Sequence, residues 1–513
     1  MKKNIFQKFL ILLAIITLSN ACTDSFLEVD KRGLTDEADF YKTDDQALAA
    51  VVSAYDMLQS MYAKDWTSAW FLKVTPGGEI SNPDDDQPHY YELMTFTHTA
   101  ENSVISAVFR EIYFGIYRAN KVLERVEPDS DVKTIVRAEA KFLRALYYFD
   151  LVTLWGEVPL VTTVLAGGEY AQPKNSVTEI WAQIESDLSE ASQDLLLRSE
   201  MISRFGNAHL FRATKGAAQA LLGKAYLFQE KYDLASAQFE SVIASGEYDL
   251  VDDFSTILKK ETEFGIESLF EISYSTEEGH TWANGTFPWG NGRRQENMIH
   301  WQLAGPRGDG YFNGGTTGLI NGWGFAYPTQ SIYDAFKAED LVRRQASIMS
   351  EAELIAKGGS MRFNGELHRA NPGFIRLKYG TWLSETNEAT QAELNYGTNI
   401  RLIRYADVLL MAAEAYHKSS QYTDAQALTE LNKVRVRADL TPLSEFSIAM
   451  EDIRYERTAE LAFEGHRFLD LVRWGLASEV LGAKGYQARH RYLPIPQFEL
   501  DINPNLEQNP DWK

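Results

Sequence analysis

Aromatic side chains gather in two segments of this sequence where glycine, proline and acidic residues replace the helical pattern. Residues 279–324 contain 12 of the 34 glycines and four of the 11 tryptophans, and residues 64–102 contain two more tryptophans and the run SNPDDDQPHYY. Glycine at this density indicates loops with close backbone approach. Long loops are functional or disordered, and this aromatic content does not suit disorder.

Exposed aromatic rings on loops can bind a sugar, because the apolar face of a sugar ring stacks on a flat ring while nearby polar side chains hydrogen-bond its hydroxyls. The candidate glycan-binding residues are Trp66, Trp70, Asp84, Tyr91, Trp282, Trp289, Trp301 and Tyr311. Trp282 and Trp289 rank first, because they flank Gly285 and have few aliphatic neighbours. The alternative for each ring is that it fills the core of the loop region, which we expect for Trp323.

The sequence lacks the motifs of common catalytic and cofactor sites. It has no HExxH, GxSxG, phosphate loop or GxGxxG, and its nine histidines show no HxH or HxxxH spacing. We therefore predict no catalytic residue, no metal site and no cofactor. Asp84 to Asp86 could offer oxygen ligands to calcium, but the run lacks the pattern of an EF-hand loop, so a solvated loop is expected. A carboxylate pair for glycoside hydrolysis stays open, because its spacing is a spatial property.

The single cysteine, Cys22, excludes an internal disulfide and follows a stretch with the layout of an export signal. Three lysines precede the apolar run from Phe9 to Leu18, which is too short to cross a bilayer. We predict a lipoprotein signal peptide at residues 1–21, lipidation of Cys22, and a lipid-tethered segment at residues 22–40. Ser19 departs from the usual lipobox, which has leucine at that position.

The chain is strongly acidic. Its 72 Asp and Glu against 50 Lys and Arg give a net charge of −22, and loss of the three signal-peptide lysines makes it −25. Nucleic-acid binding relies on clustered cations, so no nucleic-acid partner is expected. Hydrophobic residues make up 45% of the sequence, which is typical of a globular protein with a large core.

Helical periodicity flanks the central loop region. Apolar residues recur at three- and four-residue spacing within residues 41–250 and again from about Ile400. Residues at the offsets of a tetratricopeptide unit are Gly223, Tyr226, Ala235 and Phe239 in one copy and, in part, Ala413, Tyr416 and Ala425 in another. We predict a helical region at 41–250, a loop-rich ligand-binding lobe at 251–398, and helices with an extended tail at 399–513.

Four C-terminal segments carry a specific resemblance. NIRLIRYADVLLMAAEAY (399–416), ALTELNKVRVRA (427–438), ERTAELAFEGHRFLDLVRWG (456–475) and YLPIPQFELDINPNLEQNP (492–510) resemble the SusD/RagB family of Bacteroidetes surface lipoproteins, which act in nutrient uptake. CTDSFLEVDKRGLT and GWGFAYPTQSIYDAF also fit the family. The resemblance implies a mainly α fold, with a tetratricopeptide-like helical superhelix packed against an irregular loop-rich lobe. It also implies a SusC-like TonB-dependent outer-membrane transporter as partner.

The resemblance and the loop aromatics together predict a non-catalytic protein, lipid-anchored at the cell surface in the outer membrane, that binds oligosaccharide or polysaccharide. A peptide ligand, as in RagB-type members, is the alternative within the family, and a surface glycoside hydrolase is the alternative outside it. In the helix predicted over 456–475, Arg457 and Arg467 each lie three residues from an acid, Glu460 and Glu464 respectively, so ion pairs along one side are expected.

Overall fold

The computed structural model describes residues 40–64, 66–84, 86–277, 279–282 and 296–513, so the predictions for Cys22 and Trp289 lie outside the described residues. The described chain is mainly α-helical, as the sequence predicted. The main helices are α3 (Asp44–Ala63), α4 (Ala69–Val74), α5 (Pro88–Thr95), α6 (Ser103–Arg125), α7 (Asp131–Leu154), α8 (Val177–Asp194), α9 (Arg198–Phe205), α10 (Lys215–Phe228), α11 (Tyr232–Ala244), α16 (Tyr405–Lys418), α17 (Asp424–Arg437), α18 (Ala449–Glu460) and α19 (Arg467–Arg473). None of the helices in these ranges is long and apolar enough to cross a bilayer.

The remaining elements are short. The helices are α12 (His300–Leu303), α13 (Gln330–Asp334), α14 (Leu341–Ser347), α15 (Glu351–Ala356), α20 (Ala477–Leu481) and α21 (Gln497–Ile502). The strands are β1 (Ile80–Ser81), β2 (Ser268–Ile272), β3 (Tyr327–Pro328), β4 (Ile348–Ser350), β5 (Arg362–Phe363), β6 (Glu366–Leu367), β7 (Phe374–Arg376) and β8 (Ile400–Arg404). They form two-stranded antiparallel pairs: β1 with β3, β2 with β8, β4 with β7 and β5 with β6.

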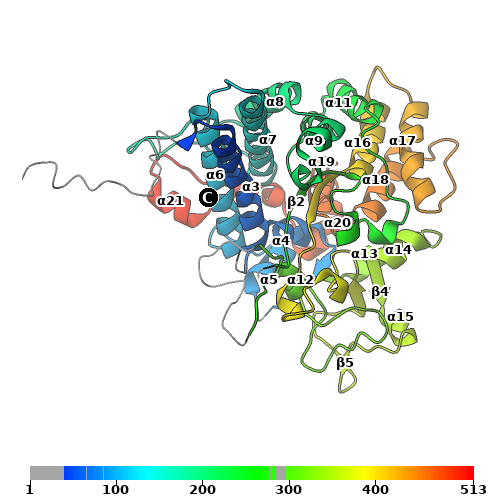
Figure 1. The fold of residues 1–513 in the computed structure, drawn as a ribbon. Coiled ribbons are helices and arrows are strands. Elements are labelled where there is room, and N and C mark those ends of the chain that lie inside the picture. The colour runs from blue at the N-terminus through cyan, green and yellow to red at the C-terminus, as the bar shows by residue number, and fades with distance from the viewer. Residues whose placement is uncertain (1–39, 65, 85, 278, 283–295) are drawn as a thin grey trace, which may run out of the picture.

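Helix pairs stack side by side across the upper part of Figure 1. The pairs are α3 with α6, α7 with α8, α10 with α11, and α16 with α17, and each packs on the next through α6 and α7, α8 and α10, and α11 and α16. This is the predicted tetratricopeptide-like superhelix. The short elements α12 to α15, β4 and β5 lie below it and form the lobe (Figure 1).

Local sequence signals start several of these helices. Thr43, Ser176 and Thr423 precede α3, α8 and α17, and each hydroxyl accepts the N–H of the third helical residue, whose Gln or Glu side chain accepts the cap's own N–H. Gly223 lies where α10 crosses α11, and an added Cβ there would lie 2.6 Å from the ring of Phe239. The small residue predicted at this crossing is therefore required by close packing.

The prediction that helix resumes near Ile400 is wrong for its first residues. Ile400–Arg404 is strand β8, which pairs with β2, and α16 begins only at Tyr405. Four of the five residues of β8 are buried: Ile400 and Ile403 pack in the core, and the buried arginines Arg401 and Arg404 have carboxylate partners.

The single helix predicted over 456–475 is also wrong. Helix α18 ends at Glu460 and α19 begins at Arg467, and between them Phe463 and Gly465 have φ values of 67° and 85°. The break places the carbonyl oxygen of Phe463 where it accepts the indole N–H of Trp70 at 2.9 Å. Here a hydrogen bond between residues 393 positions apart in the sequence outweighs the local helix propensity.

The predicted ion pairs exist as a network, but with other partners. Arg457 binds Asp407 at 2.8 Å and Asp470 at 2.8 Å. Glu460 accepts hydrogen bonds from Arg404 and Arg437. Burial alone would raise the pKa of Glu460, but the three nearby arginines outweigh it and hold this pKa well below its usual range. The network therefore ties α18 to α16, α17, α19 and β8 inside the core.

Candidate functional site

Pairing of β1 with β3 brings together the two segments that the sequence singled out. The acidic run follows Ser81, and the glycine-rich loop precedes Tyr327, which is its partner in the ladder. The N–H of Ala326 donates to Asn82 Oδ1 at 3.0 Å. At Gly322 an added Cβ would lie 2.5 Å from the carbonyl oxygen of Gln302, so the loop can fold this closely only with glycine.

Trp66 and Trp323, one from each segment, form the aromatic centre of this region. Their ring centres lie 5.2 Å apart with the planes tilted by 37°, and both side chains are half-buried. The Tyr90 hydroxyl donates to the Trp66 carbonyl at 2.6 Å, and Arg307 Nη1 donates to the Trp323 carbonyl at 3.0 Å. The backbone of both tryptophans is thus held in place.

Several charged side chains lie on the same segments, and Arg307 links them to Trp323. Arg307 lies 2.6 Å from Asp309 and 3.8 Å from Asp86, and Arg369 lies 3.2 Å from Asp84. These carboxylates are mostly exposed, so each pair contributes only about 0–1 kcal/mol to stability. The carboxylate oxygens and the guanidinium nitrogens of these pairs remain at the surface, where they can form hydrogen bonds to the hydroxyls of a ligand.

A second aromatic group borders the charged residues. The Tyr311 ring lies 5.5 Å from the rings of Phe363 and His368. Burial and the nearby Arg307 lower the pKa of His368, so its imidazole is neutral at pH 7. We call this region the lobe surface and define it as Trp66, Asp84, Asp86, Arg307, Asp309, Tyr311, Trp323, Phe363, His368 and Arg369.

The structure places the predicted site residues in three groups. Trp66, Asp84 and Tyr311 belong to the lobe surface, and Tyr91 is exposed nearby on α5. Trp282 is 43% exposed, and its indole N–H donates to Glu393 at 3.0 Å. Its role as a binder stays a prediction.

Trp70 and Trp301 contradict the prediction that they contact a glycan. Their side chains are 2% and 0% exposed, so no ligand reaches their faces. The Trp301 ring stacks on Tyr379 at 4.4 Å, and the guanidinium of Arg376 lies 4.8 Å from the Trp70 ring and 5.5 Å from the Trp301 ring. These two tryptophans fill the core between helices and lobe, which was the alternative considered for each ring.

Sequence reasoning did not identify Arg307, Asp309, Phe363, His368 or Arg369 as members of the lobe surface. It treated Asp86 only as part of a solvated loop and underrated Trp323. Phe363 ends β5, and His368 and Arg369 follow its hairpin partner β6. This hairpin carried no motif, and its side chains reach the site only because it folds next to Tyr311 and Asp84. Trp323 was expected only to pack. Its position in a Gly-Trp-Gly run was the available signal, because small neighbours leave the ring accessible.

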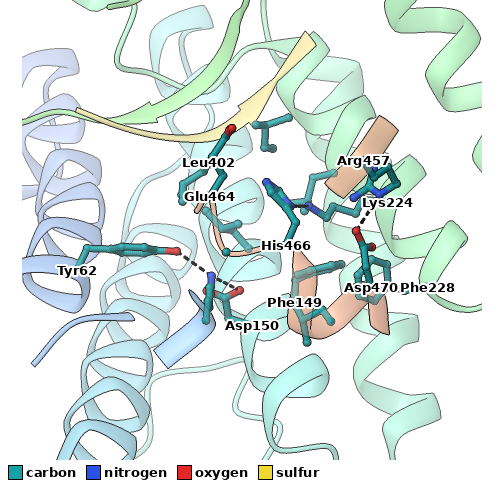
Figure 2. A pocket seen from close by; sticks show the side chains of 16 residues that line it. Tyr62, Phe149, Asp150, Lys224, Phe228, Leu402, Arg457, Glu464, His466 and Asp470 are labelled. Carbon is teal, nitrogen blue, oxygen red and sulfur yellow. Dashed lines mark hydrogen bonds and ion pairs between the residues drawn. The ribbon is translucent and has the colours of Figure 1, made fainter. Parts of the chain in front are cut away.

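The interior also contains a cavity of about 60 Å³, drawn in Figure 2, which has room for a few waters only. Lys73 lies 2.8 Å from Asp150, and Lys224 lies 3.2 Å from Asp407 on its wall. Burial lowers the pKa of His466 to about 4, so this imidazole is neutral at pH 7. The paired charges indicate a structural role. In the described ranges no cluster of His, Cys, Asp and Glu fits a metal ion.

Comparisons with known proteins agree along the whole chain. A family model described as "SusD family" matches residues 266–491, and one described as "Starch-binding associating with outer membrane" matches residues 44–227. A SusD-like protein of Formosa agariphila is 28% identical over 532 aligned residues, which cover 99% of each chain.

Solved structures show the same relationship. A laminarin-binding SusD-like protein superposes with a TM-score of 0.80 at 30% identity, covering 92% of this chain and 100% of the other. Surface glycan-binding protein A from Bacteroides thetaiotaomicron, in complex with laminarihexaose, superposes with a TM-score of 0.75 over 91% of this chain and 100% of its own. At 24% identity this second likeness supports the fold alone.

Proposed function

Since this chain belongs to the SusD family, we propose that it is a cell-surface lipoprotein that captures oligosaccharide and delivers it to a SusC-like TonB-dependent outer-membrane transporter. The lobe surface is the proposed capture site. The protein acts by binding, without catalysis and without a cofactor.

The observation that carries this proposal is the Trp66–Trp323 pair beside Arg307. The two rings, with centres 5.2 Å apart and planes tilted by 37°, pack on each other and are each half-buried, so part of each ring remains at the surface for a sugar to stack on. Arg307 donates to the carbonyl oxygen of Trp323 and lies within ion-pair distance of Asp86 and Asp309, so these charged groups are the proposed partners for the hydroxyls of a stacked sugar. This combination of stacking faces and edge hydrogen bonds is what carbohydrate recognition requires.

A glycan and peptide array on the mature chain tests the ligand class, with product analysis after incubation to detect hydrolysis. We expect glycans to bind and to be recovered intact. Peptide binding without glycan binding would establish the RagB-type alternative, and shortened oligosaccharides would establish the hydrolase.

Substitution tests the site itself. Trp66→Ala and Trp323→Ala should each weaken glycan binding by about tenfold to hundredfold, because loss of a stacking ring costs about 1–3 kcal/mol. Isothermal titration with the best array ligand measures this change, and circular dichroism checks the fold. Leu234→Ala, at an exposed position on α11, is the matched control and should leave affinity unchanged. Unchanged affinity in both tryptophan variants would move the search to Trp282 and Trp289.

A further inference from the structure

A second pocket lies where the lobe meets the helical body. It is a cavity of about 190 Å³ between the chain before Lys260, helix α14 and the chain after β7. In Figure 1, α14 lies between α18 of the helical body and α15 of the lobe. The apolar walls come from the main core through Phe254, Ile257 and Leu258, and from the small separate cluster of the lobe through Leu377 and Trp382. Boundaries between packed units are common places for ligand sites.

Three polar side chains line this pocket and are free to bind a ligand. They are the Ser255 hydroxyl, the Lys259 ammonium and the Gln345 amide, and within the described part of the chain none of them makes a hydrogen bond or an ion pair. Ser255 and Gln345 are exposed and Lys259 is half-buried, so a molecule that enters from solvent can reach all three. An apolar hollow with a few polar groups is the usual design of a small-ligand site.

The charge on the pocket wall is positive. Lys259 and Lys378 are its charged residues, and no carboxylate from the described ranges lines it. Lys378 is 4% exposed and donates to Glu464 at 2.7 Å, so its charge is already paired. Lys259 therefore carries the charge that a ligand meets. In a protein with a net charge of −22, a pocket of this sign favours an anionic ligand.

The backbone and the side chain of Lys259 are both held in position. Arg401 donates to the carbonyl oxygen of Lys259 at 2.6 Å, and the Lys259 ammonium lies 4.6 Å from the centre of the Trp382 ring. The indole N–H of Trp382 donates to the carbonyl oxygen of Leu377 at 3.0 Å, which fixes the ring. A cation over an aromatic face keeps its charge and its N–H donors. Because this ammonium is already oriented, an anion can bind it with little further loss of side-chain entropy.

We propose that this pocket binds the anionic group of an acidic sugar, either a carboxylate or a sulfate ester. The Lys259 ammonium is the counter-ion, Ser255 and Gln345 hydrogen-bond the sugar hydroxyls, and the apolar walls contact the sugar ring. The assignment to a sugar rests on the proposed function, whereas the preference for an anion rests on the pocket itself. The pocket shares no residue with the lobe surface. It is therefore a second binding site, which selects glycans that carry a negative charge.

Titration of the mature chain with three monosaccharides tests the preference for an anion. The probes are D-glucuronate, D-glucose 6-sulfate and D-glucose at constant ionic strength, and ligand-observed NMR measures binding. At least one of the two acids should bind about tenfold more tightly than glucose, because only an acid forms a charge-assisted hydrogen bond with the ammonium. The acid that binds more tightly identifies the group as a carboxylate or a sulfate. Equal affinity for all three probes, or no binding of either acid, would overturn the proposal.

Two lysine variants locate the binding. Lys259→Gln should weaken binding of the preferred acid by about tenfold to hundredfold. Lys260→Gln is the matched control, because it removes the same charge from the next residue, which does not line the pocket. It should leave the affinity unchanged, and melting curves check that both variants are folded. Equal losses in the two lysine variants would show a general effect of charge and overturn the proposal.

The tryptophan variants of the lobe surface separate this proposal from the proposed function. Loss of acid binding in Trp66→Ala or Trp323→Ala, with binding intact in Lys259→Gln, would place the anion at the lobe surface and overturn the pocket. Weaker binding of the array glycan in the tryptophan variants, with acid binding lost only in Lys259→Gln, would support two separate sites. Acid binding that depends on Lys259, without any glycan bound on the array, would support the pocket and count against the proposed function alone.

Discussion

Arg376 shows how single residues join the two halves of this protein. Its guanidinium lies beside the rings of both Trp70 and Trp301 and donates to the carbonyl oxygens of Tyr379 and Ala304. Burial lowers the pKa of Arg376 to about 9, and aromatic faces and carbonyl oxygens solvate its charge. A cation held in this way requires both tryptophans to stay in place.

The first prediction follows from this arrangement. Trp301→Ala should lower the free energy of unfolding by about 3–5 kcal/mol, because it leaves a large cavity and exposes Arg376 to an unfilled space. Chemical denaturation measures the change. Trp282→Ala, at an exposed ring, is the control and should cost less than about 1 kcal/mol. A small effect at Trp301 would mean that its ring is not part of the core.

The second prediction at the residue scale concerns the buried carboxyl of Glu79. Its carboxylate accepts the N–H of Phe463 at 2.8 Å, but burial raises its pKa to about 7, despite Arg467 and Lys378 nearby. A carboxyl whose pKa is raised on folding stabilises the protein below its unfolded pKa, and this stabilisation is lost as the pH rises through 7. Burial of the ionised form therefore costs up to about 3 kcal/mol at pH 8.

Glu79→Gln should remove this cost, since glutamine stays neutral and can still accept from Phe463. The variant should match the parent near pH 4.5 and become more stable than the parent by up to about 3 kcal/mol at pH 8. Denaturant unfolding across this pH range measures the difference. A difference that does not change with pH would show that Glu79 does not titrate there.

At the scale of elements, the helix pairs depend on glycine where two helices touch. Gly115 on α6 faces Tyr147 on α7, and an added Cβ would lie 2.2 Å from that ring. Gly115→Ala should therefore destabilise the protein by about 1–3 kcal/mol through overpacking.

Gly482→Ala is the matched control for Gly115→Ala, which is the third prediction. Gly482 follows α20 with φ of −57°, and no atom lies within 4 Å of an added Cβ. Gly482→Ala should be neutral or stabilise by up to about 1 kcal/mol, since alanine restricts the unfolded chain more than glycine does. Thermal melting of both variants measures the effects. Equal shifts in the two variants would refute the close contact between α6 and α7.

At the scale of the whole molecule, the predicted location of the protein depends on how the acidic body is attached to the membrane. We predict that Cys22→Ala leaves the folded body unchanged but releases it from the membrane fraction, because the apolar run from Phe9 to Leu18 is too short to cross a bilayer and is followed by the only cysteine. Fractionation followed by a carbonate wash and immunoblotting measures release. Thr23→Ala, which keeps the cysteine, is the control. Retention of the Cys22 variant on washed membranes would refute lipid anchoring.

The helical regions, the α10–α11 pair and, in part, the α16–α17 pair were predicted from the sequence itself. The three- and four-residue spacing of apolar side chains, the capping residues and the small residue at Gly223 are local signals, and local hydrogen bonds and near-neighbour packing satisfy them. The glycines in the loops are also a local signal, because the backbone geometry at each position decides whether glycine is needed there.

Tertiary structure alone decided which loop aromatics pack and which face solvent. Trp70 and Trp301 come from the same two loop-rich segments as Trp66 and Trp323, but both meet Arg376, and Trp70 also meets Phe463, from distant parts of the chain, and they are buried. The ion-pair partners of Glu460 and the break after α18 also depend on contacts with distant parts of the chain. Burial and ion pairing depend on residues that are close in space and far apart in sequence, so no spacing along the chain can specify them.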